Sequence, residues 1–125
     1  MARLIIKGRL PGLNEYIDAE RRNRYRAAQM KREAEELVIW SAKASRLRKF
    51  KNPVMMFYTW FEPSRKRDKD NISGYGRKVI QDALVKGGYL PGDGWAHIIG
   101  FADEFQVDKK EPRIEVVIEE VTWET

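Results

Sequence analysis

Apolar and polar positions recur with two different periods along this chain, and the switches between those periods predict the order of its elements. Residues 2–8 are typical of a short strand that ends in a glycine. Residues 22–47 place small and apolar side chains at the 3.6-residue spacing of a helix, namely Ala27, Met30, Ala34, Leu37, Val38, Ser41 and Ala44. The stretch between them, residues 10–18, is expected to form a loop or a short helical turn.

The second half of the chain repeats the change of period. Residues 54–61 are an aromatic and β-branched run between two prolines, which predicts a strand buried on most of its surface. Residues 71–86 return to helical spacing and stop at a pair of glycines. After a turn-rich loop over residues 89–94, residues 95–101 and 113–121 are expected to be strands.

This order, β-α-β-α-β-β, predicts one α+β domain over residues 1–125, with a mixed sheet and two main helices. The absence of cysteine excludes disulfide scaffolds, thiolate metal sites and cysteine nucleophiles. His97 is the single histidine, so carboxylates are the abundant metal ligands. No apolar run has the roughly 20 residues that span a bilayer. We expect a soluble cytoplasmic protein with no membrane partner and no organic cofactor.

Charge is distributed unevenly around the formal net value of +5. Residues 21–51 contain eleven basic and three acidic side chains, whereas residues 102–125 contain three basic and eight acidic ones. A basic segment of this kind favours a polyanionic partner, and nucleic acid is the usual one. A solvated helix face that keeps the protein in solution is the alternative interpretation.

The densest cluster of chemical groups runs from Arg65 to Asn71, between the predicted strand and the predicted second helix. In an extended segment Asp68 and Asp70 point the same way, and two such carboxylates repel unless a cation lies between them. Oxygen ligands without cysteine or histidine suit Mg²⁺ or Mn²⁺, and neighbouring cations would hold phosphates beside that metal. The alternative is structural, because Asp and Asn are common helix caps.

Two further groups follow along the chain. Asp82 lies four positions after Lys78, so the two are neighbours on one helix face, either as a surface ion pair or with Lys78 as a clamp on a phosphate. Asp93 stands between two glycines in the turn-rich loop and is either a turn residue or a further carboxylate of the site.

These motifs resemble those of the RusA-type Holliday-junction resolvases, which occur in bacteria and are often encoded by prophages. The similarity is carried by Arg67-Asp68-Lys69-Asp70-Asn71, Lys78, Asp82-Ala83-Leu84 and Gly88-Tyr89-Leu90-Pro91-Gly92-Asp93. More loosely, it extends over residues 4–120. Six residues separate Asn71 from Lys78, more than in the best-known form of the motif. Either the helix starts later than the motif, or Lys78 is offset around it.

The resemblance implies a homodimeric, Mg²⁺-dependent endonuclease that nicks opposing strands of a four-way DNA junction symmetrically during recombination and repair. It implies that Asp68, Asp70 and Asp93 hold the metal, for which Mn²⁺ can substitute, that Lys78 is catalytic, and that Asp82 and Asn71 support the site. Basic side chains around the motif and in the first helix are expected to contact the DNA backbone: Arg65, Lys66, Arg67, Lys69, Arg21, Arg22, Arg24 and Arg26.

Three other functions stay open at this point. The chain could be a non-catalytic DNA-binding accessory protein in which the acidic cluster is structural. It could be a metal-dependent nuclease that acts on other branched DNA, such as flaps or forks. It could also be a regulatory protein whose basic helix binds an acidic partner, in which case DNA binding would depend only weakly on salt.

Overall fold

The structure is a computed structural model of the chain and describes residues 2–122. In this range the order of elements is β1 (Ala2–Lys7), α1 (Leu13–Arg22), α2 (Arg24–Ala44), β2 (Val54–Glu62), α3 (Lys69–Lys86), β3 (Ile98–Val107) and β4 (Arg113–Glu120). The predicted α+β class is confirmed, with three helices in the described range in place of two main ones. Trp123, in the acidic tail, lies outside the described residues.

The four strands form one mixed sheet in the order β1-β4-β2-β3. β4 pairs antiparallel with both β1 and β2, whereas β2 and β3 run parallel. The parallel pair is joined through α3, as a parallel connection requires a crossover. The carboxyl end of β2 therefore leads directly into the start of α3, where the acidic motif lies.

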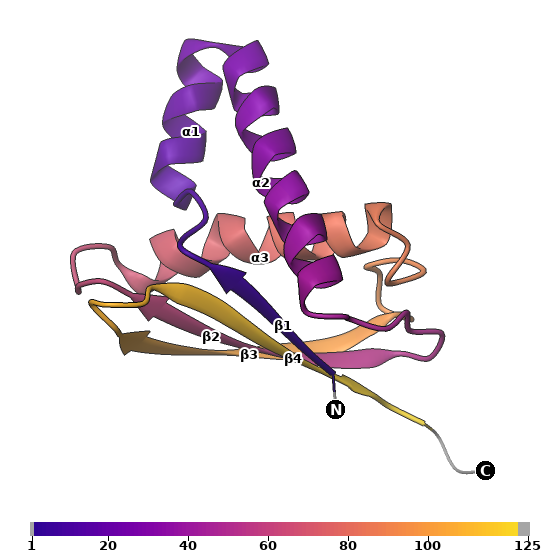
Figure 1. The fold of residues 1–125 in the computed structure, drawn as a ribbon. Helices are drawn as coiled ribbons and strands as arrows, with labels where there is room; N and C mark the ends of the chain where they lie inside the picture. The colour runs from indigo at the N-terminus through magenta and orange to yellow at the C-terminus, as the bar shows by residue number, and fades with distance from the viewer. Residues whose placement is uncertain (1, 123–125) are drawn as a thin grey trace.

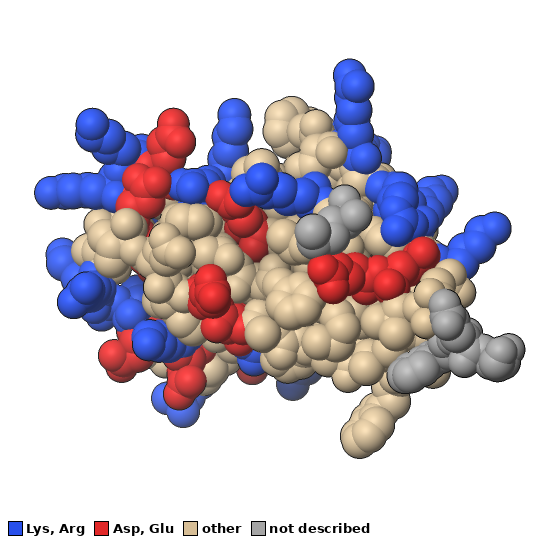
Figure 2. Space-filling model, turned by 90° about the horizontal axis from the view of Figure 1, so that it is seen from below, with Lys and Arg blue, Asp and Glu red and all other residues tan. Residues whose placement is uncertain are grey.

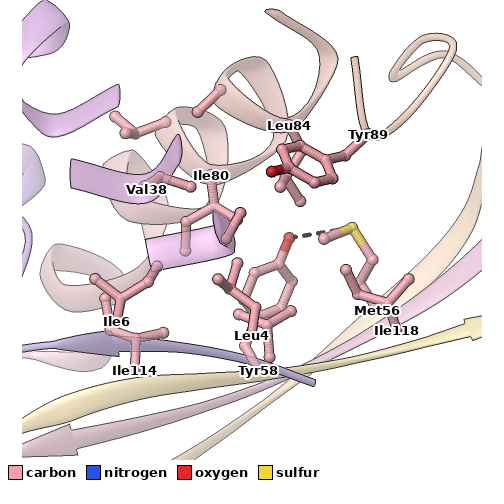
Figure 3. Packing of buried hydrophobic residues seen from close by; sticks show 14 of the residues in the cluster. Leu4, Ile6, Val38, Met56, Tyr58, Ile80, Leu84, Tyr89, Ile114 and Ile118 are labelled. Atoms are coloured by element: carbon pink, nitrogen blue, oxygen red, sulfur yellow. Dashed lines mark hydrogen bonds between the residues drawn. The ribbon is translucent and has the colours of Figure 1, made fainter. Parts of the chain in front are cut away.

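All three helices lie on one side of the sheet, as Figure 1 shows. α3 crosses the sheet, while α1 and α2 form an antiparallel hairpin that rises away from it. Alternate strand residues point toward the helices and are buried. These side chains pack against one face of α2 and α3 to form the core seen in Figure 3, which includes Leu4, Ile6, Val38, Met56, Tyr58, Ile80, Leu84, Ile114 and Ile118.

The helix predicted over residues 22–47 is present as α2, which begins after Asn23 and ends at Ala44. The backbone of Asn23 is extended, at φ −162° and ψ 111°, and its side chain accepts hydrogen bonds from the Tyr25 and Arg26 N–H groups. Asn23 is thus the N-cap of α2, which is a preferred role of asparagine. The segment before it is a ten-residue helix and not the loop or short turn expected over residues 10–18.

The opposite face of the sheet carries no helix within residues 2–122 (Figure 2). The strand predicted over residues 54–61 is therefore buried on one face only, and Phe57 on its other face is 38% exposed. The predicted strand over residues 95–101 begins later, at Ile98, and runs on to Val107. None of the helices formed by residues 2–122 is long and apolar enough to cross a membrane.

Candidate functional site

A groove of about 980 Å³ opens where β2 ends and α3 begins. Asp68 is the N-cap residue of α3, and Asp70 lies in its first turn. Both are exposed and line the groove together with Glu62, Ser64, Arg65, Arg67, Lys69, Ile72, Phe105, Gln106 and Val107. The expectation that Asp68 and Asp70 point the same way in an extended segment is wrong, because only Asp68 is extended and Asp70 is already helical. Both nevertheless line the groove, and their joint site stays a prediction.

The carboxylates of Asp68 and Asp70 have no hydrogen-bond or ion-pair partner among residues 2–122. Asp68 occupies the capping position, but its side chain makes no capping hydrogen bond. The side chain of Asn71 faces the neighbouring helix, where its Oδ1 accepts the N–H of Asn14 at 2.8 Å. Neither carboxylate therefore caps α3 through a hydrogen bond, and the structural contribution that remains is the favourable interaction of their charge with the N-terminal end of the helix.

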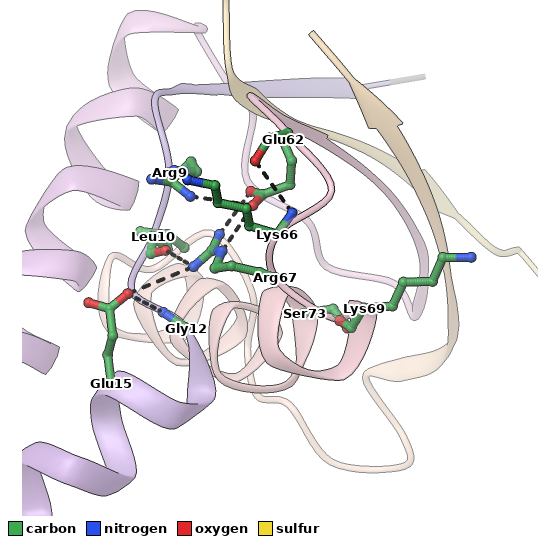
Figure 4. Close-up of polar contacts among 10 residues, drawn as sticks. Arg9, Leu10, Gly12, Glu15, Glu62, Lys66, Arg67, Lys69 and Ser73 are labelled. Atoms are coloured by element: carbon green, nitrogen blue, oxygen red, sulfur yellow. Dashed lines mark hydrogen bonds and ion pairs between the residues drawn. The ribbon is translucent and has the colours of Figure 1, made fainter. Parts of the chain in front are cut away.

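Arg67 and Glu62 are two of the residues that line the groove, and Figure 4 shows their polar contacts. The Arg67 guanidinium donates from Nε and Nη2 to the two Glu62 oxygens at 2.9 and 2.8 Å. It also donates to the carbonyl of Leu10 at 3.2 Å. The two side chains are only 15% and 7% exposed, so each is largely withdrawn from water. A buried charge needs such a partner, and this pair fixes the chain between β2 and α3.

The contacts with Glu62 and Leu10 distinguish Arg67 from the other basic residues of the motif. Arg65, Lys66 and Lys69 are exposed and have no ion-pair partner within residues 2–122, although the ammonium of Lys69 lies 5.6 Å from the Phe105 ring centroid. Arg67 is already engaged by protein atoms, so its packing does not favour the expected contact with DNA. The other three can reach a ligand without breaking a buried contact.

Lys78, Asp82 and Asp93 form a second cluster, to which α2 contributes Lys31. Lys78 lies 3.2 Å from Asp82, so the predicted i,i+4 pair is present, and it lies 3.9 Å from Asp93. Asp82 also accepts a hydrogen bond from Lys31 of α2 at 2.9 Å. Sequence reasoning missed Lys31, because no spacing within one helix reveals which residue of another helix it meets.

Lys31 and Lys78 keep the Asp82 carboxylate ionised. Partial burial by itself would raise the pKa of Asp82, but the hydrogen bonds and charges of Lys31 and Lys78 outweigh burial and hold that pKa below its usual value. The hydrogen bond to Asp82 conversely raises the pKa of Lys31. The carboxylate is thus held ionised by neighbouring ammonium groups, a typical arrangement for an ion pair that joins two helices.

The two groups of acids lie at different places along α3. The helix begins at Lys69, so the later start that the sequence left open does not occur. Lys78 lies eight positions after Asp70, which corresponds to about 12 Å along a helix axis. No three acidic or histidine side chains of residues 2–122 come together as a metal-binding group. A metal held jointly by Asp68, Asp70 and Asp93 stays a prediction.

Asp93 projects from the loop after α3, where its side chain is 41% exposed. Trp95, two residues later, is fully exposed, whereas His97 is partly covered. The close approach of the loop to His97 requires a glycine at position 92, because a Cβ there would lie 2.7 Å from the imidazole Cδ2.

The basic residues expected to contact DNA from the first helix lie where α1 turns into α2. Arg21 and Arg22 end α1, and Arg24 and Arg26 begin α2. All four are exposed, and Arg22 makes an ion pair with Asp18 at 3.7 Å. Sequence reasoning passed over Tyr25 among them, which is 87% exposed.

Compared with models of protein families and with curated protein sequences, the chain shows no match.

Proposed function

We propose that the chain is a Mg²⁺-dependent endodeoxyribonuclease that cuts branched DNA, with the four-way junction as its preferred substrate. The observation that carries the proposal is the pair of carboxylates, Asp68 and Asp70, that line an open groove without any protein partner in the described chain. The motif resemblance to the RusA-type resolvases supports the choice of substrate. The exposed cations around the groove suit a phosphodiester backbone.

The donor set of the groove fits Mg²⁺. This ion keeps several waters and is usually held by one or two carboxylates together with phosphates of the substrate, rather than by a complete protein cage. Asp68 and Asp70 would hold it, with no other protein ligand required. When bound, the metal supplies an activated water and stabilises charge on the phosphate oxygens.

The other residues of the site act on the DNA. Arg65, Lys66 and Lys69 place positive charge around the two carboxylates and would hold backbone phosphates at the groove. The first N–H groups of α3 point toward the same end of the helix and favour an anion there. Lys78, which is 62% exposed, can release Asp93 and reach a phosphate farther along α3. Asp93 has two alternative roles: it keeps its contact and orients Lys78, or it is released and joins the metal once DNA is bound.

A second copy of the chain is the proposed occupant of the open face of the sheet. Ile5, Phe57 and Val117 lie on this face, and the first two are each 38% exposed. Such an uncovered apolar surface across three neighbouring strands is typical of an interface. A twofold substrate such as a four-way junction is matched by a twofold protein.

The charges at the two edges of the sheet favour one orientation of that pair. Lys7 lies on this face of the edge strand β1, where the neighbouring Arg3 is already paired with Glu115, and Glu104 lies on the same face of the other edge strand, β3. With the twofold axis parallel to the strands, β1 of one copy faces β3 of the other, so opposite charges meet. With the axis perpendicular to the strands, β1 faces β1 and like charges meet.

Cleavage of one defined substrate set tests the proposed function. Four-way junction, three-way fork, 5′ flap and linear duplex of shared sequence are incubated with the protein in Mg²⁺ and in EDTA. We expect paired nicks on opposing strands of the junction, in Mg²⁺ only, and much slower cleavage of the linear duplex. Asp68→Asn and Asp70→Asn provide the inactive controls, and Glu36→Gln, an exposed acid on α2, provides the matched active control.

Three results would contradict the proposal in different ways. Metal-independent cleavage, or cleavage unchanged in both aspartate variants, would remove the metal site. Binding of the junction without cleavage would identify a DNA-binding accessory protein. Faster cleavage of flaps or forks than of the junction would keep the nuclease and change its substrate. The dimer is tested separately by sedimentation, where Phe57→Glu should yield monomers and Trp40→Glu, on a helix away from this face, should not.

A further inference from the structure

The tip of the α1–α2 hairpin is an exposed and basic part of the molecule. Residues 20–26 are all exposed, and Figure 1 shows the hairpin standing clear of the sheet. Arg21, Arg24 and Arg26 have no ion-pair partner among residues 2–122, whereas Arg22 is paired with Asp18. The tip therefore presents three uncompensated guanidinium groups at the point of the molecule farthest along the hairpin.

Two of these arginines stand where helix electrostatics disfavours them. Arg24 and Arg26 are in the first turn of α2, which contains no acidic residue. Cations at a helix N-terminus meet the positive end of the macrodipole and the unpaired N–H groups, so they weaken the helix that carries them. The basic side chains at the end of α1, by contrast, suit their helix end. Residues that oppose their local structure often indicate a binding function.

Tyr25 lies between Arg24 and Arg26 and is 87% exposed, with no aromatic or cation–π contact in the described chain. The other tyrosine of the hairpin, Tyr16, stacks on Tyr75 at 4.4 Å between ring centroids. An unpacked aromatic ring flanked by arginines combines a stacking surface with phosphate ligands. This is the combination by which proteins hold unpaired bases.

We infer that the hairpin tip is a second DNA contact, at which Tyr25 stacks on an unpaired or splayed base at the branch point while Arg21, Arg24 and Arg26 bind the adjoining phosphates. The inference rests on the proposed function, because it takes branched DNA as the ligand. In a continuous duplex every base is already stacked on its neighbours, so Tyr25 would find a free base only at a branch. The hairpin tip would thus allow the protein to distinguish branched DNA from duplex.

The distance from the tip to the groove fits a single DNA strand. α1 begins beside α3, where the Asn14 N–H is bound to the Asn71 side chain, and ends at the tip ten residues later. A helix of that length spans about 15 Å. A few nucleotides of backbone cover this span, so the tip would hold the branch while the groove meets the strand a few nucleotides away.

The test measures branch recognition separately from cleavage. The wild type, Tyr25→Ala, Tyr25→Phe and Trp40→Ala are titrated in EDTA against a four-way junction and a linear duplex, each with 2-aminopurine at the position that forms the branch in the junction. Trp40→Ala is the matched control, because Trp40 is an exposed aromatic of the same helix, 69% accessible, at a distance from the tip. Cleavage of the same junction in Mg²⁺ is followed in parallel.

We expect Tyr25→Ala to lower the preference for junction over duplex by roughly tenfold, a common effect of losing one base–aromatic stack. The 2-aminopurine quenching at the branch should disappear with Tyr25→Ala and persist with Tyr25→Phe and Trp40→Ala.

An unchanged preference and unchanged quenching in Tyr25→Ala would overturn the inference and leave the nuclease proposal intact if the junction is still cut. Loss of quenching in Tyr25→Ala without any wild-type cleavage would support the tip and refute the nuclease. A wild type that binds neither DNA would overturn both.

Discussion

Two acidic clusters lie along α3, and they differ in what neutralises them. At the start of the helix, Asp68 and Asp70 line an open groove and receive no hydrogen bond or ion pair from residues 2–122. Toward the end of the helix, Asp82 is held by Lys31 and Lys78 at 2.9 and 3.2 Å. The same residue type thus has two roles, since paired acids hold helices together and unpaired acids can bind a ligand.

The contrast explains why one part of the motif suits metal binding better than the other. A carboxylate that already has two ammonium partners must lose them before it can bind a cation. Asp68 and Asp70 need to lose only water. A substitution in the groove should therefore change activity, whereas a substitution at Asp82 should change stability.

Asp70→Asn is expected to have the largest effect. Removing one carboxylate from the groove should reduce cleavage at least about 100-fold, the usual scale for loss of a charge-stabilising group at a reacting centre. Junction binding in EDTA should be retained or become tighter, because one negative charge that faces DNA is gone. Single-turnover cleavage and fluorescence anisotropy measure the two quantities, and a variant as active as the wild type would exclude Asp70 from the mechanism.

Arg67→Ala should affect folding more than DNA binding. It leaves the Glu62 carboxylate buried with only Arg9 nearby at 3.5 Å, so we expect a loss of about 3 kcal/mol in the free energy of unfolding. Arg65→Ala, the matched exposed variant, should leave stability unchanged and weaken DNA binding with a smaller salt dependence. Urea unfolding and salt titrations test the pair, and equal stability of both variants would contradict the structural role of Arg67.

Asp82→Asn should reduce stability by about 1 kcal/mol at neutral pH, since charged hydrogen bonds to Lys31 and Lys78 are weakened. The pKa of Asp82 is lowered on folding, so its stabilising effect is present above the ordinary value of 3.8 and is lost as the pH falls below it. The difference in unfolding free energy between wild type and variant should therefore shrink in acid. A difference that is constant from pH 7 to pH 3 would show that the ion pairs do not stabilise the fold.

Asp93→Asn is expected to have the smallest effect on stability, under about 0.5 kcal/mol, because its contact with Lys78 is long and exposed. Its effect on cleavage decides to which cluster it belongs. A loss as large as that of Asp70→Asn, relieved by high Mg²⁺, would place Asp93 among the metal ligands when DNA is bound. A loss that matches Lys78→Ala, with unaltered Mg²⁺ dependence, would assign it to positioning Lys78.

Local pattern predicts the core better than it predicts the hairpin. The strand predicted over residues 113–121 is present as β4, and its alternate residues Ile114, Val116 and Ile118 are buried, because one face of a sheet has a two-residue period. α1 was missed because contacts with α3 stabilise it, among them the stack of Tyr16 on Tyr75. The later part of β3 was missed because an edge strand with an uncovered face has little apolar pattern to read.

The candidate site shows the same division. The spacing of Asp68 and Asp70 was visible in the sequence because both lie within one short segment. The structural role of Arg67 was not visible in the sequence. It depends on the burial of Glu62, and the residues of the motif do not reveal that burial. Lys31 reaches Asp82 from another helix, so only the packing of α2 on α3 brings the two together.

Manganese binding tests the central claim most directly, because Mn²⁺ can replace Mg²⁺ at oxygen ligands and its free fraction is measured by electron paramagnetic resonance. We predict that the wild type and Asp82→Asn bind Mn²⁺ equally in the presence of a junction with non-cleavable linkages, and that Asp68→Asn and Asp70→Asn each bind it much more weakly. Equal binding by all four proteins, or weakening only in Asp82→Asn, would contradict a metal site in the groove.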